Sequence, residues 1–125
     1  MSHFTTIDVQ IKDIEALRAA CAELGLELAE NAEARGWGGN ARHGDFVIRL
    51  KGPYDVALNR SAYGTYATEA DLWNGHVERE LGPNLGRLRQ LYAVHKTAIE
   101  ARRRGLHVRR QGMNDGRIRL TLCRV

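Results

Sequence analysis

The stretch from Asn84 to Val125 constrains the fold most, because it predicts a long helix that ends sharply and is followed by a strand hairpin. Within the helix, one stripe is formed by side chains that recur at steps of three and four residues: Leu88, Tyr92, His95 and Ile99. That stripe is expected to pack against an apolar surface. Gly105 ends the pattern as a left-handed residue, and the preceding basic run Arg102-Arg103-Arg104 complements the partial negative charge of the helix end.

The predicted hairpin consists of two alternating segments, residues 106–111 and 117–123, on either side of a turn that contains Gly116. A two-residue turn at Asp115-Gly116 would place Val108 opposite Cys123, whereas a three-residue turn with Gly116 left-handed places Val108 opposite Leu122. We favour the three-residue turn, which directs Val108 and Leu122 toward the helices. The outward face of the hairpin is then expected to carry Arg109, Arg117 and Arg119.

The first 25 residues predict a strand followed by a helix. Between Phe4 and Ile11 one of the two alternating sets of residues is mostly apolar: Thr5, Ile7, Val9 and Ile11. This pattern is typical of a strand with one buried face. Asp13 is expected to cap the N-terminus of the helix, and Gly25 is expected to end it. The helix should bury Ile14, Leu17, Cys21 and Leu24.

The middle of the chain has weaker signals. Residues 31–44 have no strong period and predict a loop with Trp37 inside it, although residues 26–28 alternate as a strand does. Two strands, residues 46–51 and 54–60, are expected to form a hairpin that turns at Gly52-Pro53. A short strand over residues 65–68 and a weak helix within 69–80 should follow, and Asn84 is expected to cap the long helix.

These elements predict one α+β domain over residues 1–125, with a mostly antiparallel sheet and two main helices on one face. The arrangement has ferredoxin-like character. Two helix-Gly-strand junctions of similar sequence, Leu24-Gly25-Leu26 and Arg104-Gly105-Leu106, are consistent with two β-α-β-β halves. Such junctions also recur in unrelated folds.

Charge is distributed unevenly along the chain. Residues 1–80 carry 8 Lys/Arg and 13 Asp/Glu, whereas residues 81–125 carry 11 and 2, so the formal charges of the two parts are −5 and +9. This asymmetry permits docking to an acidic protein or a nucleic acid, or association between opposite ends of two copies. No apolar run is long enough to span a membrane. Two isolated cysteines, Cys21 and Cys123, predict reduced thiols and a cytoplasmic location.

No catalytic constellation emerges from the sequence. The five histidines have no partner at the spacing that clusters ligands on a helix, so no metal and no cofactor are expected. His95 is expected to be a hydrogen-bonded core residue rather than a proton relay. Trp37 either covers an edge of the core or forms an exposed recognition tip with Arg35.

A basic surface for phosphates could be formed by the arginines near the C-terminus: Arg102, Arg103, Arg104, Arg109, Arg117 and Arg119. Single-strand binders place aromatic rings beside such charges, and residues 93–125 contain no Trp or Tyr. A solvated basic face, or one paired with the acidic first half, is therefore the favoured interpretation.

Several short segments together resemble the family catalogued as domain of unknown function 1257, which includes a hypothetical protein of plastid genomes. They are Met1 to Ile7, Ile11 to Leu17, Arg35-Gly36-Trp37-Gly38-Gly39, Leu58-Asn59-Arg60, Tyr92-Ala93 with His95-Lys96, and Asp115 to Leu120. The resemblance implies a small soluble intracellular protein without established catalytic residues, located in the plastid stroma if plastid-encoded. It also implies an accessory role, since relatives tend to be associated with ATPases of the AAA type.

The leading hypothesis is a non-enzymatic protein-interaction or adaptor module. Two alternatives stay open. The first is nucleic-acid binding through the arginine-rich C-terminal face. The second is small-ligand binding or catalysis around Trp37, Asn59, Tyr92 and His95, which requires these residues to meet in one pocket.

Overall fold

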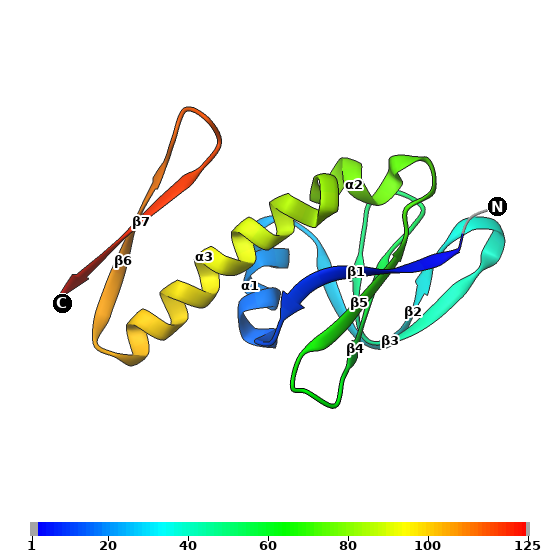
Figure 1. The fold of residues 1–125 in the computed structure, drawn as a ribbon, viewed down its shortest axis with the longest axis horizontal. Helices are drawn as coiled ribbons and strands as arrows, with labels where there is room; N and C mark the ends of the chain where they lie inside the picture. The colour runs from blue at the N-terminus through cyan, green and yellow to red at the C-terminus, as the bar shows by residue number, and fades with distance from the viewer. Residues whose placement is uncertain (1–2, 125) are drawn as a thin grey trace.

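The computed structural model describes residues 3–124, and these residues form two antiparallel sheets and two main helices (Figure 1). The larger sheet has the strand order β1 (Phe4–Ile11), β5 (Tyr66–Asp71), β4 (Val56–Arg60), β3 (Ala41–Arg49) and β2 (Glu27–Arg35). Apolar residues of one sheet face pack with α1 (Ile14–Glu23) and α3 (Gly86–Arg103) to form the main core. The predicted α+β class is confirmed.

The first strand and helix follow the sequence prediction closely. β1 buries Ile7, Val9 and Ile11 on one face, which is the expected alternation. The carboxylate of Asp13 accepts a hydrogen bond from the Ala16 backbone N–H at 3.2 Å and so caps α1. Gly25 follows the helix with a φ of +73°, a left-handed conformation that glycine adopts at little cost.

The predicted loop over residues 31–44 is wrong, because most of it belongs to β2 and β3. These strands pair from Glu27 opposite Arg49 to Arg35 opposite Ala41, and a short turn, Trp37–Gly39, lies between them. The alternation of faces changes phase at Asn31, which has a φ of +49°. Ala29 and Ala32 are three residues apart, yet both pack against the same small apolar cluster on one face of the sheet. A strict two-residue period is therefore absent from the sequence.

That small cluster lies on the sheet face opposite the helices. Its buried members are Ala34, Val47 and Ala57, and Phe4, Ala29 and Ala32 pack against them. Val47 alternates with the main-core residues Phe46 and Ile48 on the same strand. This part of the sheet therefore buries apolar side chains on both of its faces.

Between β4 and α3 the chain forms short elements. β5 extends beyond the predicted residues 65–68, and a turn at Trp73–Gly75 leads into a short helix, α2 (His76–Leu81). Asn84 does not cap α3, which is a correction to the prediction. The preceding turn, Pro83–Leu85, places Asn84 at a φ of +55°, and Leu85 occupies the N-cap position without a side-chain hydrogen bond.

The C-terminal hairpin consists of β6 (Leu106–Gly112) and β7 (Ile118–Arg124), and it forms a sheet of its own. Val108 pairs with Leu122, and Gly116 has a φ of +89°, which confirms the predicted register and turn. Figure 1 shows the hairpin beside α3, away from the larger sheet. Ile118 packs against the main core, and Leu122 on the same hairpin face lies toward α3, where it lines a small cavity with Ala101 and is 56% exposed.

The expected single sheet is thus divided in two, and the two helix-Gly-strand junctions lead into different sheets. This strand order establishes neither ferredoxin-like character nor two β-α-β-β halves. None of the helices formed by residues 3–124 has the length and apolar character that crossing a membrane requires.

Candidate functional site

A groove of about 620 Å³ lies between β1 and α3. On the β1 side four consecutive residues line it, Asp8 to Ile11, so the backbone edge of the strand faces the groove. On the α3 side the lining residues follow one helical stripe: Arg89, Tyr92, Ala93, Lys96, Thr97 and Glu100. β1 is the terminal strand of the larger sheet, and among the described residues no strand pairs with its outer edge.

Tyr92 fixes the position of β1 relative to α3. Its hydroxyl oxygen accepts hydrogen bonds from the backbone N–H groups of Lys12 and Asp13, both at 3.0 Å. These two residues connect β1 to α1, so one side chain of α3 holds the point where the strand ends. Tyr92 is buried on the predicted stripe, together with Leu88 and Ile99.

The polar side chains of the groove include an ion pair along the helix. Lys96 Nζ lies 3.1 Å from Glu100 Oε1, one helical turn away. This hydrogen bond raises the pKa of Lys96 above its ordinary value. The groove thus has charged groups at its rim and the small side chain of Ala93 between them.

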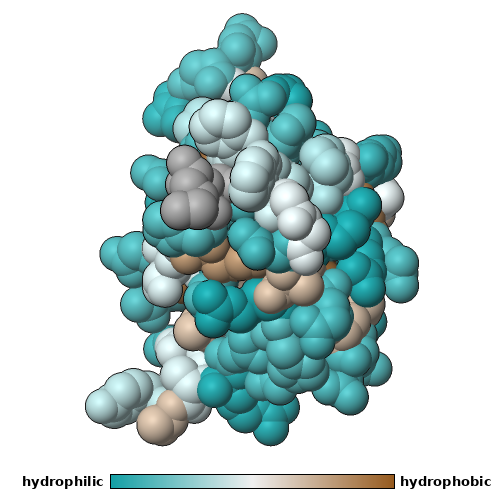
Figure 2. Space-filling model, turned by 90° about the vertical axis from the view of Figure 1, so that its right-hand side faces the viewer, coloured by the Kyte–Doolittle hydropathy of each residue, from teal (hydrophilic) through white to brown (hydrophobic). Residues whose placement is uncertain are grey.

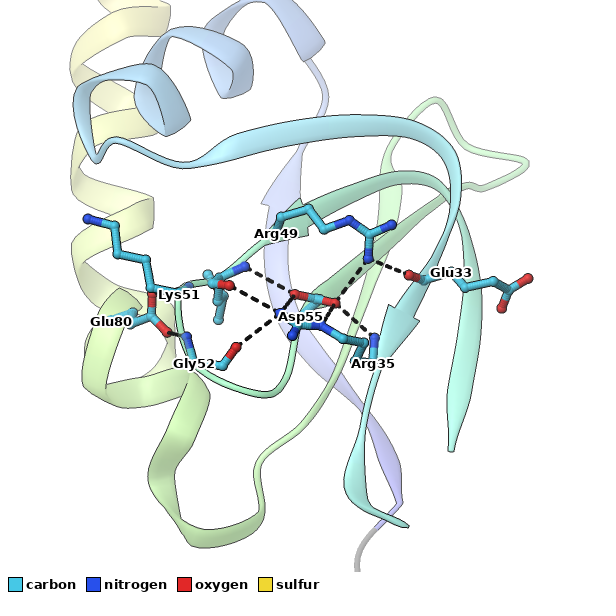
Figure 3. Close-up of polar contacts among 8 residues, drawn as sticks. Glu33, Arg35, Arg49, Lys51, Gly52, Asp55 and Glu80 are labelled. Carbon is cyan, nitrogen blue, oxygen red and sulfur yellow. Dashed lines mark hydrogen bonds and ion pairs between the residues drawn. The ribbon is translucent and has the colours of Figure 1, made fainter. Parts of the chain in front are cut away.

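Arg35, which the sequence suggests as an interaction residue, forms part of a buried charge network (Figure 3). Asp55 is fully buried, and its carboxylate lies 2.8 Å from both Nε and Nη2 of Arg35 and 3.2 Å from Nη1 of Arg49. Arg35 also donates to the carbonyl oxygens of Leu50 and Gly52. The network therefore fastens the turn between β3 and β4 to the end of β2.

Opposing effects act on the pKa of Asp55. Burial would raise it, but hydrogen bonds from the side chain and backbone of Arg35 and from the Leu50 backbone outweigh burial and lower it. Asp55 is thus held as a carboxylate. Sequence reasoning missed this residue, although an aspartate directly before the apolar run Val56-Ala57-Leu58 was a usable signal.

Trp37 and Trp73 lie in two turns of similar backbone conformation. The backbone N–H groups of Trp37 and Trp73 donate to the two oxygens of Asp71, at 2.9 and 3.0 Å, and Asp71 is fully buried. Both turns have positive φ at their second and third residues: Gly38, Gly39, Asn74 and Gly75. The two indoles are 44% and 50% exposed. Figure 2 faces this end of the molecule, where pale side chains of intermediate hydropathy gather among hydrophilic ones.

The four residues proposed for a ligand pocket have different partners. Asn59 bridges β3 and β4, since its side chain accepts from the Asp45 N–H and donates to the His43 carbonyl oxygen, both at 2.9 Å. His95 pairs with Glu23, whereas Trp37 and Tyr92 make the backbone contacts given above. Of these four residues only Tyr92 lines the groove.

Glu23 joins α1, α3 and the hairpin. Its carboxylate accepts two hydrogen bonds from Arg110 of β6, at 2.9 and 2.7 Å, and lies 2.8 Å from His95 Nε2. The hydrogen bonds from Arg110 are the main cause that lowers the pKa of Glu23 from 4.5 to about 2, with a further contribution from His95. His95 is therefore a half-buried, hydrogen-bonded residue.

We expect the stability that Glu23 contributes to be complete above pH about 4.5 and to be lost as the pH falls toward about 2, because its folded pKa is depressed. The measurement is the free energy of unfolding in urea, across this pH range, for the wild type and Glu23→Gln. The difference between the two proteins should shrink toward the acid end. Glu27→Gln is the matched control, since the described residues offer Glu27 no ion pair or side-chain hydrogen bond. A difference for Glu23→Gln that does not change with pH would contradict the expectation.

The six arginines of the predicted basic surface are all exposed, and two of them have a carboxylate partner. The register of the hairpin places Arg109 and Arg119 on one face, whereas Arg117 lies in the turn before β7. Arg117 pairs with Asp115 at 2.6 Å, and Arg103 lies 3.4 Å from Glu15. Within residues 3–124 no ion-pair partner is found for Arg102, Arg104, Arg109 and Arg119.

A model of the family described as "Protein of unknown function (DUF1257)" matches residues 20–121, a range that includes α3, β6 and the first part of β7. No curated protein and no solved structure matches the chain.

Proposed function

The chain belongs to the DUF1257 family, and on this premise we propose that it is a non-enzymatic protein-interaction module that binds an extended segment of a partner protein between β1 and α3. The observation that carries the proposal is the groove itself, which combines an open strand edge with a helical stripe. The resemblance to proteins associated with AAA-type ATPases makes a segment of such an ATPase the proposed partner.

The edge of β1 supplies the main-chain part of the interaction. The outer N–H and C=O groups of a terminal strand have no ladder partner, so an extended segment can add to the sheet as one more strand. Such main-chain hydrogen bonds provide affinity with little dependence on side-chain identity. β1 is held in place for this role by Tyr92, which fixes its C-terminal end.

The α3 stripe supplies the side-chain part of the interaction. A segment added to β1 would place alternate side chains toward α3, where Ala93 leaves space and Arg89, Lys96 and Glu100 offer charged partners. Ala93 is exposed and small. A large side chain at position 93 would therefore fill the groove without entering the main core.

The test uses random linear peptides selected by display on the full chain. Selected peptides should shift the backbone amide NMR signals of Asp8 to Ile11, and Ala93→Arg should weaken their binding at least about tenfold, equivalent to ~1.4 kcal/mol. Ala22→Arg is the matched control, because Ala22 is an exposed helical alanine of α1 that does not line the groove. Peptides that bind both variants equally, or a failure to select any peptide that shifts β1 signals, would contradict the proposal.

A further inference from the structure

The groove continues past β1 into a second, smaller cavity at the base of the hairpin. This cavity has a volume of about 80 Å³ and is lined by Thr97, Glu100, Ala101, Arg104, Leu106 and Leu122. Thr97 and Glu100 line both spaces. We call the two spaces together the channel: both lie along α3, and residues of β1 line the first whereas residues of the hairpin line the second.

The wall of the channel at the hairpin end is apolar and incompletely covered. Leu122 is 56% exposed and is the one large aliphatic side chain found exposed in residues 3–124. Leu106, on the same face of the hairpin, is half-buried. The space between these leucines and Ala101 fits an apolar side chain, whose burial there would also remove Leu122 from water.

The rim of this cavity is basic. Arg104 is exposed, and no carboxylate of the described chain pairs with it. Glu100, the acidic residue of the lining, is already paired with Lys96. A carboxylate beside the apolar side chain would therefore find an available guanidinium.

The length of the channel limits the length of the segment. From Arg89 to Arg104 the helix rises by roughly 22 Å, at about 1.5 Å per residue. An extended chain covers that distance in about seven residues, at about 3.3 Å per residue. One short linear motif is thus long enough to reach from the edge of β1 to the hairpin.

We infer that the occupant is an extended segment of a partner protein that carries an aliphatic or aromatic residue for the Leu106/Leu122 cavity and an adjacent Asp or Glu for Arg104. This inference rests on the proposed function, because it specifies the chemistry of a segment that the groove binds. The basic hairpin disfavours the same face of a second copy as the occupant, since two such surfaces repel each other.

The test selects display peptides separately on the full-length wild type, Arg104→Glu and Arg119→Glu. Wild-type selection should yield an apolar residue next to an acidic one, and synthetic peptides with Lys in place of that acid should bind about tenfold more weakly. On Arg104→Glu the preference should reverse, so that the Lys peptide binds better than the acidic one. Arg119→Glu is the control, because Arg119 lies on the outward face of the hairpin and should leave the preference unchanged.

Three results would overturn this inference. The first is a set of peptides whose binding is weakened by Ala93→Arg but which show no preference for an acidic residue. This result would refute the inference and leave the proposed function intact. A single-stranded oligonucleotide that displaces the peptides at physiological salt, and does not bind Arg104→Glu, would assign the channel to nucleic acid. A concentration-dependent dimer that Ala93→Arg dissociates would assign it to a second copy. If no selected peptide depends on Ala93, the proposed function itself fails.

Discussion

Asp55→Asn should lower the free energy of unfolding by about 3 kcal/mol, the lower end of the cost of breaking a buried ion pair. The substitution keeps the shape of the side chain but removes the charge that accepts from Arg35, Arg49 and Leu50. The low end is expected because the two arginine side chains are 50% and 34% exposed and regain some hydration. Urea denaturation monitored by circular dichroism gives the difference in the free energy of unfolding between the wild type and Asp55→Asn.

Asp8→Asn is the matched control for this change. Asp8 has the same side chain as Asp55, but it is exposed, and the described residues offer its side chain no hydrogen bond or ion pair. Its replacement should alter the free energy of unfolding by no more than about 0.5 kcal/mol. If Asp55→Asn is as stable as Asp8→Asn, the carboxylate does not hold the turn between β3 and β4 as described.

Gly44→Ala should destabilise the protein by about 3 kcal/mol, the upper part of the usual range for overpacking. A Cβ atom at this position would lie 2.5 Å from the Phe46 carbonyl oxygen and 2.9 Å from Val47 Cγ2. The first contact involves backbone in the middle of β3, so relief requires the strand itself to move. The melting temperature and the urea midpoint should both fall.

Gly112→Ala tests whether the effect comes from close packing rather than from replacing any strand glycine. Gly112 lies at the end of β6, and an added Cβ would meet no atom within 4 Å. We expect this variant to stay within about 0.5 kcal/mol of the wild type, or to gain slightly from a less flexible unfolded chain. Equal destabilisation by both substitutions would contradict the packing described for the small cluster.

The helix α1 and the C-terminal hairpin were predictable because the residues that mark where they begin, turn or end lie within or beside them in the sequence. Asp13 and Gly25 bracket α1, and Gly105 and Gly116 mark the end of α3 and the turn of the hairpin. β2 and the first part of β3 were not predictable, for a physical reason. The strand changes face at Asn31, and the residues on either side of it that pack against the small cluster, Ala29 and Ala32, are alanines, so neither periodicity nor hydrophobic content marked it.

The candidate site was predictable only in part. Tyr92 was singled out correctly as a residue of the inward stripe, but its partners, Lys12 and Asp13, are about 80 residues away in the chain. The groove depends on the backbone edge of β1, and a backbone edge has no residue-type signature. Asn59 was predicted as a ligand or interaction residue, and in the structure its side chain bridges β3 and β4.

The shared anchoring of Trp37 and Trp73 on Asp71 has a consequence for spectroscopy. These are the two tryptophans of the chain, and they lie in the turn between β2 and β3 and the turn between β5 and α2. Figure 1 shows both turns at the end of the molecule opposite the hairpin. Intrinsic fluorescence therefore reports on one corner of the molecule. Detachment of the hairpin from α3 would leave the emission unchanged, so a reporter placed on β6 or β7 is needed to observe it.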